Sequence, residues 1–223
     1  TVTPALLEWL DSIRNDYQLT AVRLLLPSSG EPVAALPVQT PAFSSRERTA
    51  VTANAGTDEQ LLVTFDTASQ SSRLHILLPV SPQGDPDKPP LLLLDLEADL
   101  DQLLDSTLNP HLASLLGKTG EVVLVDSQMR FLTHTKYPMR DGTMPIPLQT
   151  RNPDKAVELA VTGSEGTIAA DDYRNIPVLA AYRHIQLTPD VSWGMVVKRD
   201  QQEIYADLNH QKQVYWEIGR AHV

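Results

Sequence analysis

One arrangement of strands and turns occurs twice in the chain, about 100 residues apart, and it limits the possible folds more than any other feature. Residues 21–26 and 32–36 are two strand patterns separated by a Pro-Ser-Ser-Gly turn. The same pattern returns at 121–125 and 129–133, around an Asp-Ser-Gln turn. Each predicted hairpin begins one half of the chain, so we expect two modules of similar design.

The ends of the two halves also correspond. Each half closes with two strand patterns and a helix, at 74–80, 91–96 and 98–104 in the first half and at 177–185, 193–198 and 200–216 in the second. Asp200 is the predicted N-cap of the last helix, because Glu203 follows at capping-box spacing. Strands that are close in sequence usually pair, so we expect mostly antiparallel sheets.

Further helices are predicted from apolar spacing and from helix start signals. They cover Pro4–Tyr17 with Thr3 as N-cap, Ser45–Ala53, and Asn152–Thr162 with Asn152 as N-cap. Residues 166–173 add a strand, and Trp193 is expected to be buried as the largest apolar side chain of its strand. The predicted class is α+β, with two tandem modules at 1–110 and 111–217, each an antiparallel sheet with flanking helices.

Composition excludes several classes of protein. The chain has 28 Asp and Glu against 18 Lys and Arg, and a nucleic-acid-binding protein needs a basic face instead. The acidic excess is concentrated in residues 1–117, which hold 15 acidic and 6 basic side chains. The absence of Cys excludes disulfides, thiolate nucleophiles and cysteine metal sites, and it fits an oxidising compartment.

The two ends of the chain suggest that it is a fragment. It begins without Met, and no apolar run reaches the ~20 residues of a membrane helix. Residues 218–223, Ile-Gly-Arg-Ala-His-Val, match the translation of a common sequencing adapter. We therefore expect the native sequence to end near Trp216 and residues 218–223 to be an artefact.

Catalytic motifs are not found. Gly117-Lys118-Thr119 resembles the end of a phosphate loop, but the position that should hold its first Gly is Leu112. Asp171 and Asp172 are adjacent and would point to opposite faces of a strand. The histidines at 75, 111, 134, 184 and 210 show no i, i+3 or i+4 spacing. We predict no catalytic residues, no metal site and no cofactor.

The second half carries a more specific pattern in residues 117–126, 172–182 and 193–204. It has a Thr-Gly-Glu strand, an Asp-Tyr-Arg segment leading into Val-Leu-Ala-Ala, and a Trp-Gly strand that ends in Asp. This pattern resembles the membrane-proximal module of double Cache domains, which consist of two PAS-like modules. Asn175 stands where the pattern has a turn Gly, and Asn tolerates the positive φ of such a turn. The first half is assigned to the distal module by the repeat alone.

The resemblance implies a fold, a place and a role. Each module would be a five- or six-stranded sheet, in the periplasmic part of a bacterial inner-membrane receptor anchored by flanking spans that the fragment lacks. The parent would be a sensor histidine kinase, a diguanylate cyclase or a chemotaxis transducer and could form a homodimer. The fragment itself would not be an enzyme and would bind a small solute. The alternative is a structural or protein-binding tandem module without a small-molecule ligand.

The ligand itself is not specified by the sequence. The aromatic–Arg–Trp–Tyr signature of amino-acid sensors is missing, because residues 24–96 hold no Tyr or Trp. Candidate ligand-binding residues are polar side chains on apolar strands, namely Arg73, His75, Arg23, Tyr173, Arg174, Tyr182 and His184. Arg73 is the first candidate for an anionic or zwitterionic solute such as an organic acid or amino acid. Alternatively, these arginines pair with the many acids of the first half.

Overall fold

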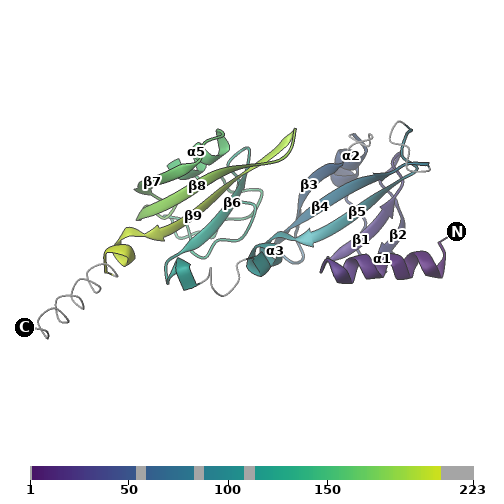
Figure 1. Cartoon of the computed structure of the whole chain (residues 1–223), viewed down its shortest axis with the longest axis horizontal. Coiled ribbons are helices and arrows are strands. Elements are labelled where there is room, and N and C mark those ends of the chain that lie inside the picture. Colours follow the sequence, from purple (N-terminus) through teal and green to yellow (C-terminus); the bar gives the residue numbers. More distant parts are fainter. Residues whose placement is uncertain (1, 54–58, 83–87, 108–113, 207–223) are drawn as a thin grey trace, which may run out of the picture. The chain divides into compact units, whose positions relative to one another are not determined.

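The computed structural model describes residues 2–53, 59–82, 88–107 and 114–206. The chain divides into two compact units, Thr1–Asp105 and Ser106–Val223. Each unit contains one antiparallel sheet with flanking helices, as Figure 1 shows. The predicted α+β class with two PAS-like modules is therefore confirmed. The predicted boundary after residue 110 lies outside the described residues, as does the predicted artefact at 218–223.

The first unit has a five-stranded sheet in the order β2-β1-β5-β4-β3. Its strands are β1 (Ala21–Leu25), β2 (Pro32–Leu36), β3 (Gln60–Asp66), β4 (Ser71–Val80) and β5 (Leu92–Asp99), and its helices are α1 (Pro4–Asp16), α2 (Ser45–Ala53) and α3 (Leu100–Thr107). The strand order places β5 and β4 in the interior of the sheet, so each of them is paired with a neighbouring strand on both edges.

The two faces of this sheet have separate apolar cores. On one face, Leu10 of α1 packs with Val22, Leu24 and Leu94. On the other face a second cluster contains Leu25, Phe43, Val51, Leu77 and Leu93, and it reaches α2 through Val51. Because strand side chains alternate between faces, the second face also receives the polar residues at positions 23, 75 and 95.

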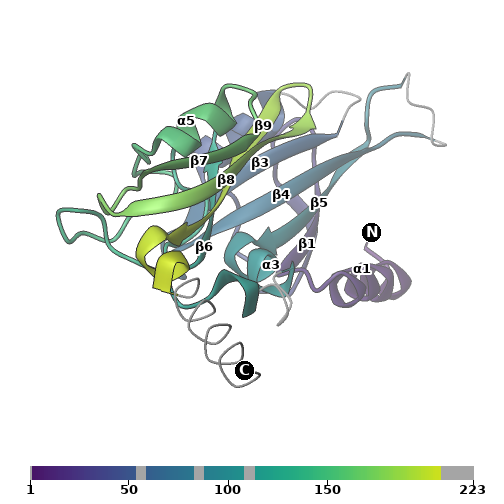
Figure 2. The ribbon, with the colours of Figure 1, turned by 60° about the vertical axis from the view of Figure 1, so that its left-hand side comes forward.

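The second unit has a four-stranded sheet in the order β6-β9-β8-β7. Its elements are β6 (Glu121–Asp126), α5 (Lys155–Val161), β7 (Gly166–Asp171), β8 (Pro177–Thr188) and β9 (Val191–Asp200). Helix α5 packs across β8 and β9, which Figure 2 shows from the side. The core beneath it is built from Val157, Phe131, Tyr173 and Val196. Trp193 is 8% exposed, so its predicted burial is confirmed.

The second strand of the proximal hairpin was predicted wrongly. Residues 129–133 form isolated bridges at Arg130 and Phe131, and Phe131 donates its N–H to Thr150 rather than to a neighbouring strand. The Asp126 carboxylate accepts the N–H groups of Gln128 and Arg130, which tightens the turn. The returning segment pairs with β6 only briefly, through Asp126 N–H to the Arg130 carbonyl and Leu132 N–H to the Leu124 carbonyl. The second sheet therefore has four strands and not the five or six expected, whereas the first unit gains the unpredicted β3.

One predicted helix cap is wrong, and one predicted capping box does not form. Helix α5 has Asp154 as its N-cap, and the Asn152 side chain accepts the Asp154 N–H at 2.9 Å. The last strand continues through Asp200, which directly precedes the helical residues as predicted and donates its N–H to Thr119. Glu203 does not close a capping box, because its carboxylate accepts the N–H groups of Lys118 and Thr119 at 2.8 and 2.9 Å. Residues 201–206 are helical, and the rest of the predicted exit helix lies outside the described residues.

Other local predictions are confirmed. The Thr3 hydroxyl caps α1 by accepting the Leu6 N–H at 3.3 Å, and α2 has the predicted bounds. Asn175 has φ 63°, which is the left-handed turn expected where the Cache pattern has Gly. Among the described residues, no helix is long and apolar enough to cross a membrane.

Candidate functional site

The three candidate residues of the first half lie together on one face of the first sheet. Arg23 comes from β1, and Arg73 and His75 come from β4. The antiparallel register places each of them directly opposite an acidic residue of β5. These acids occupy alternate positions, namely Asp95, Glu97 and Asp99. The basic residues of this cluster were predicted from the sequence, and the acidic residues were not.

Arg23 is held by two carboxylates. It is 3% exposed, and its Nη1 and Nη2 donate to Asp95 Oδ2 at 2.6 Å and to Glu97 Oε2 at 2.5 Å. Its guanidinium also lies over the Phe43 ring, 5.0 Å from the centroid. A buried charge is stable only when it is paired, so these acids explain why an arginine can lie in the interior of the sheet. Arg23 therefore orients the two carboxylates and offers little charge to a ligand.

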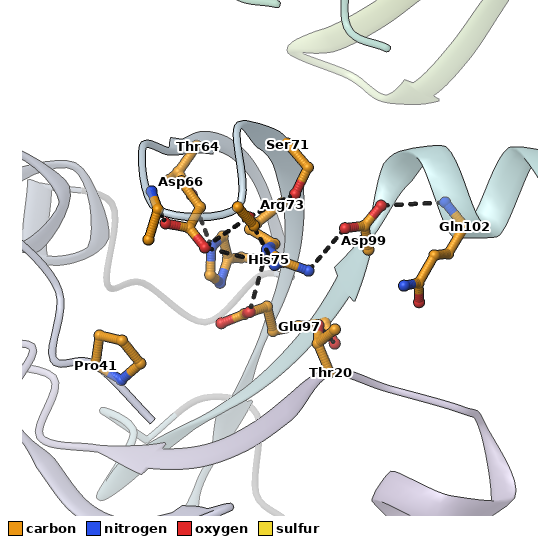
Figure 3. Close-up of polar contacts among 12 residues, drawn as sticks. Thr20, Pro41, Thr64, Asp66, Ser71, Arg73, His75, Glu97, Asp99 and Gln102 are labelled. Atoms are coloured by element: carbon orange, nitrogen blue, oxygen red, sulfur yellow. Dashed lines mark hydrogen bonds and ion pairs between the residues drawn. The ribbon is translucent and has the colours of Figure 1, made fainter. Parts of the chain in front are cut away.

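Arg73 lies among three carboxylates and is more accessible. Its Nη1 donates to Asp99 at 2.9 Å, its Nη2 lies 3.4 Å from Asp66 and 2.9 Å from Ser69, and its Nε is 3.9 Å from Glu97 (Figure 3). Hydrogen bonds from Ser69 and Arg73 hold the pKa of Asp66 below its usual range. The Arg73 side chain is 15% exposed, so a solute can reach it from the solvent side.

His75 is almost fully buried, with 2% of its surface exposed. Its Nδ1 lies 3.1 Å from Asp95 Oδ1, and its Nε2 lies 3.0 Å from the hydroxyl oxygen of Thr64. The ring meets Phe43 edge-to-face, with 5.0 Å between centroids. Both ring nitrogens thus have polar partners, and these partners fix the orientation of the imidazole.

These side chains border a cavity of about 420 Å³. The central strands contribute Arg23, Arg73, His75 and Glu97, and the edge strand β3 contributes Thr64 and Asp66. Phe43 comes from the segment before α2, and Glu47 comes from the first turn of α2. A cavity of this volume is in the range of small-molecule sites. Its walls combine aromatic surface with charged groups of both signs, which suits a small charged solute.

The candidate residues of the second half divide into two places. Tyr173 is 2% exposed, and its hydroxyl donates to the carboxylate of Glu121 at 2.8 and 2.9 Å. The Nζ of Lys198 lies 3.7 Å from the centroid of the Tyr173 ring. Burial, together with the negative charge of Glu121, raises the pKa of the Tyr173 hydroxyl above its usual range. Tyr173 therefore belongs to a buried ionic network, which we name the Lys198 cluster.

The Lys198 cluster consists of one ammonium and three carboxylates. Lys198 Nζ lies 2.7 Å from Asp172, 3.3 Å from Glu121 and 3.9 Å from Asp154, and its side chain is 1% exposed. Burial raises the pKa of Asp154 to about 7. Burial would also raise the pKa of Asp172, but its contacts with Lys198 and with Arg174 outweigh burial and hold that pKa below its usual range.

Arg174 closes this cluster on the side of the last strand. It donates to Asp172 at 2.6 Å and to Asp200 at 2.5 Å, and its guanidinium lies over the ring of Tyr137. Tyr182 and His184 take no part in these contacts. His184 Nδ1 lies 2.9 Å from the carbonyl of Ala160, which ties the ring to α5. Tyr182 packs at the edge of the core and borders a shallow surface hollow.

Comparisons with known proteins agree with this fold. No protein-family model matches the sequence, and no curated protein does. Among solved structures, the extracellular domain of rpHK1S-Z16, named as a histidine kinase, has a TM-score of 0.62 at 16% identity, covering 92% of this chain and 80% of its own.

Two Pseudomonas aeruginosa PAO1 chemoreceptor domains are also similar. The ligand-binding domain of PctB, solved with L-Arg, has a TM-score of 0.58 at 16% identity and covers 96% of this chain and 79% of its own. That of PctC, solved with GABA, has a TM-score of 0.55 at 17% identity and covers 90% and 83%. At such identities the likeness shows a shared fold alone.

Proposed function

We propose that this chain is the periplasmic sensory region of a bacterial inner-membrane receptor and that it binds a small solute in the cavity of its first unit. The observation that carries the proposal is the cavity of about 420 Å³, lined by Arg73, His75 and Glu97, in a fold that extracellular ligand-binding domains share. The proposal assigns no turnover to this chain. Its chemistry is binding, and the parent's output is a histidine kinase, a diguanylate cyclase or a chemotaxis transducer.

The charges around the cavity favour a solute that carries an ammonium group. Both arginines are already paired with acids, whereas the carboxylates of Asp66 and Glu47 border the cavity near its surface. A simple organic acid would meet these carboxylates as like charges. A zwitterion can place its ammonium near Asp66 and its carboxylate near Arg73. GABA and L-Arg, the ligands in PctC and PctB, both carry an ammonium group.

The signal would leave through the terminal helices. Helix α1 packs on β1 and β2, and Glu203 ties the helical residues 201–206 to the segment before β6. A solute that favours one arrangement of these helices shifts a two-state equilibrium by its difference in affinity for the two states. In the parent receptor, membrane spans would flank the two ends, and a homodimer would pair the helices.

The test is a calorimetric and thermal-unfolding screen of amino acids, amines and organic acids against the intact chain and two variants. A true ligand at a hundred times its Kd should stabilise the first unit by about 2.7 kcal/mol. Arg73→Gln should weaken its affinity about 10-fold, the size of one lost charge-assisted hydrogen bond. The control is Arg130→Gln, because Arg130 is likewise ion-paired but lies in the second unit.

Two outcomes would contradict the proposal at different levels. Equal affinity in Arg73→Gln and in the intact chain would show that the solute binds elsewhere. If nothing in a broad screen binds, a structural or protein-binding tandem module becomes the better description.

A further inference from the structure

We propose that the first unit also holds a transition-metal ion of the Zn²⁺ type, bound by His75, Asp95 and Glu97 at the floor of the cavity. One ligand atom from each of these residues lies within 4.8 Å of the other two, and all three residues are buried. The inference does not depend on which solute the cavity takes. It adds an inorganic ligand that contacts the inner wall, whereas Arg73 and Asp66 lie nearer the entrance.

The sheet itself brings the three residues together. His75 pairs directly with Glu97 across β4 and β5, and Asp95 is the next residue on the same face of β5. Directly paired side chains lie within about 5.5 Å of each other at Cβ, and diagonal pairs remain within reach of long side chains. Two interior strands hold this backbone in place, so the ligand set is preorganised on a rigid element.

The lone pairs that a metal needs are those that Arg23 leaves free. Arg23 contacts Oδ2 of Asp95 and Oε2 of Glu97. The other oxygen of Asp95, Oδ1, lies 3.1 Å from His75 Nδ1, and the other oxygen of Glu97, Oε1, lies 3.9 Å from Arg73 Nε. Metal bonds of about 2.1 Å place neighbouring ligand atoms roughly 3.0–3.5 Å apart, which is the spacing that Asp95 and His75 already have. The ligand atom that Glu97 offers lies within 4.8 Å of those of Asp95 and His75.

Arg23 and Thr64 would then support the ligands from behind. Carboxylates and imidazoles that bind metals are commonly hydrogen-bonded on their other side, which orients them. Arg23 does this for both carboxylates, and the Thr64 hydroxyl, 3.0 Å from Nε2, does it for His75. Ligation through Nδ1 requires that this nitrogen carry no proton, with Nε2–H donating to Thr64. If the metal-free imidazole carries its proton on Nδ1, metal binding requires only that this proton move to Nε2.

The side chains around the proposed site also carry an excess of negative charge, which favours binding of a cation. On this face of the sheet the guanidinium groups of Arg23 and Arg73 are outnumbered by carboxylates, which come from Asp66, Asp95, Glu97 and Asp99, with Glu47 at the rim. A divalent ion offsets this excess. The imidazole nitrogen favours Zn²⁺, Co²⁺ or Ni²⁺ over Ca²⁺ and Mg²⁺, which prefer oxygen ligands. Three protein ligands would leave at least one coordination position for water or a solute.

The experiment uses the full chain, first stripped of metal with a chelator and then titrated with Co²⁺. We expect one equivalent to bind, with visible absorption bands of a cobalt–imidazole–carboxylate site, and Zn²⁺ to displace it. His75→Gln should weaken binding more than about 100-fold, because losing a direct ligand exceeds the loss of a supporting contact. His184→Gln is the matched control, since His184 is also a strand histidine with both ring nitrogens engaged.

A second variant protects the test against misfolding. Thr64→Val keeps the side-chain shape and should weaken Co²⁺ binding about 10-fold while leaving one equivalent bound. If His75→Gln does not fold, the His75 ring signals of the intact chain in a Zn²⁺ titration decide, and an unmoved ring overturns the inference.

Other outcomes separate this inference from the proposed function. Equal binding of Ca²⁺ and Co²⁺ without any effect of His75→Gln would reduce the site to a non-selective acidic patch and overturn the inference. Solute binding by the metal-free chain would keep the proposed function intact even when no Co²⁺ binds. A metal that binds while every organic solute fails would support the metal site alone.

Discussion

Each of the two units buries charged side chains on one face of its sheet, but the two clusters differ in how they meet solvent. In the first unit, Arg73 keeps 15% of its side chain exposed and borders a cavity. In the second unit, the Lys198 side chain is 1% exposed, and the buried Tyr173 ring lies against its ammonium. The comparison suggests a division of labour in keeping with the proposed function, in which the first cluster of charges, around Arg23, Arg73 and His75, serves binding and the Lys198 cluster serves structure.

The chemistry of the two cations fits this division. Arginine presents several donors in a planar fork, so it can hold carboxylates and still offer a donor to a ligand. Lysine is a compact charge, and three carboxylates with one aromatic ring surround Lys198. A solute could reach Lys198 only by disrupting these contacts. We therefore expect changes in the second cluster to alter stability and changes in the first cluster to alter binding.

The largest expected effect comes from removing the ammonium of the second unit. Lys198→Met keeps the length of the side chain but leaves Glu121, Asp172 and Asp154 without their shared cation. Breaking a buried pair on one side typically costs about 3–5 kcal/mol, because the remaining charge is buried without a partner. Native-state hydrogen exchange of the β9 amides measures this loss in the second unit, separately from the first.

The first unit is the internal control for that experiment. Exchange of the β5 amides should change little in Lys198→Met, because the two compact units have separate cores. A variant with unaltered β9 exchange would show that the Lys198 cluster adds nothing to stability. The contrast between a structural and a binding cluster would then be wrong.

An effect of intermediate size concerns pH and tests the Lys198 cluster through the titration of Asp154. Burial raises the pKa of Asp154 to about 7, against a usual 3.8. Between these values the unfolded chain loses the proton that the folded chain keeps, so this carboxyl makes the second unit less stable as the pH rises towards 7. The slope is at most about 1.4 kcal/mol per pH unit for one group. Above pH 7 its contribution levels off.

Asp154→Asn isolates this contribution. Asp154 is the N-cap residue of α5 without a side-chain capping hydrogen bond, so Asn replaces it without removing a cap. Unfolding of the second unit, followed from pH 5 to pH 8, should lose stability more steeply in the unchanged chain than in Asp154→Asn. Parallel curves would mean that Asp154 is ionised throughout, with Lys198 as its effective counter-ion.

The sequence predicted much of the fold because its local signals are strong. The bounds of α2, the Thr3 cap of α1 and the left-handed turn at Asn175 all follow from residue types whose preferences are decided within a few residues. The hairpin at 129–133 is shorter than predicted, because its second strand pairs with β6 only next to Phe131 and the chain leaves the sheet directly afterwards. Strand β3 was missed because all of its residues are half-buried, which gives no clear alternation.

The candidate site was predicted less completely, because its composition depends on how the strands pair with one another. Arg23, Arg73 and His75 were found as polar residues on apolar strands. Metal ligands on one helix turn are recognisable from their spacing, whereas His75 and Glu97 lie 22 positions apart in the sequence and meet only through the pairing of β4 with β5. One signal was present, since acids alternate with other residues from 95 to 99. Alternating acids on an interior strand predict a charged face, but their partners depend on the pairing.

The smallest expected effect comes from replacing Arg73 of the first unit with Met, as was done for Lys198 of the second unit. Arg73→Met should lower the stability of the first unit by only about 1 kcal/mol, because water in the cavity screens Asp66, Glu97 and Asp99 after the guanidinium is removed. The loss should shrink further at 1 M salt, where screening acts over about 3 Å, whereas the loss in Lys198→Met should not. The measurement is exchange of the β5 amides at low and high salt. A salt-independent loss as large as that of Lys198→Met would make Arg73 a structural residue, and the cavity would then lose its accessible cation.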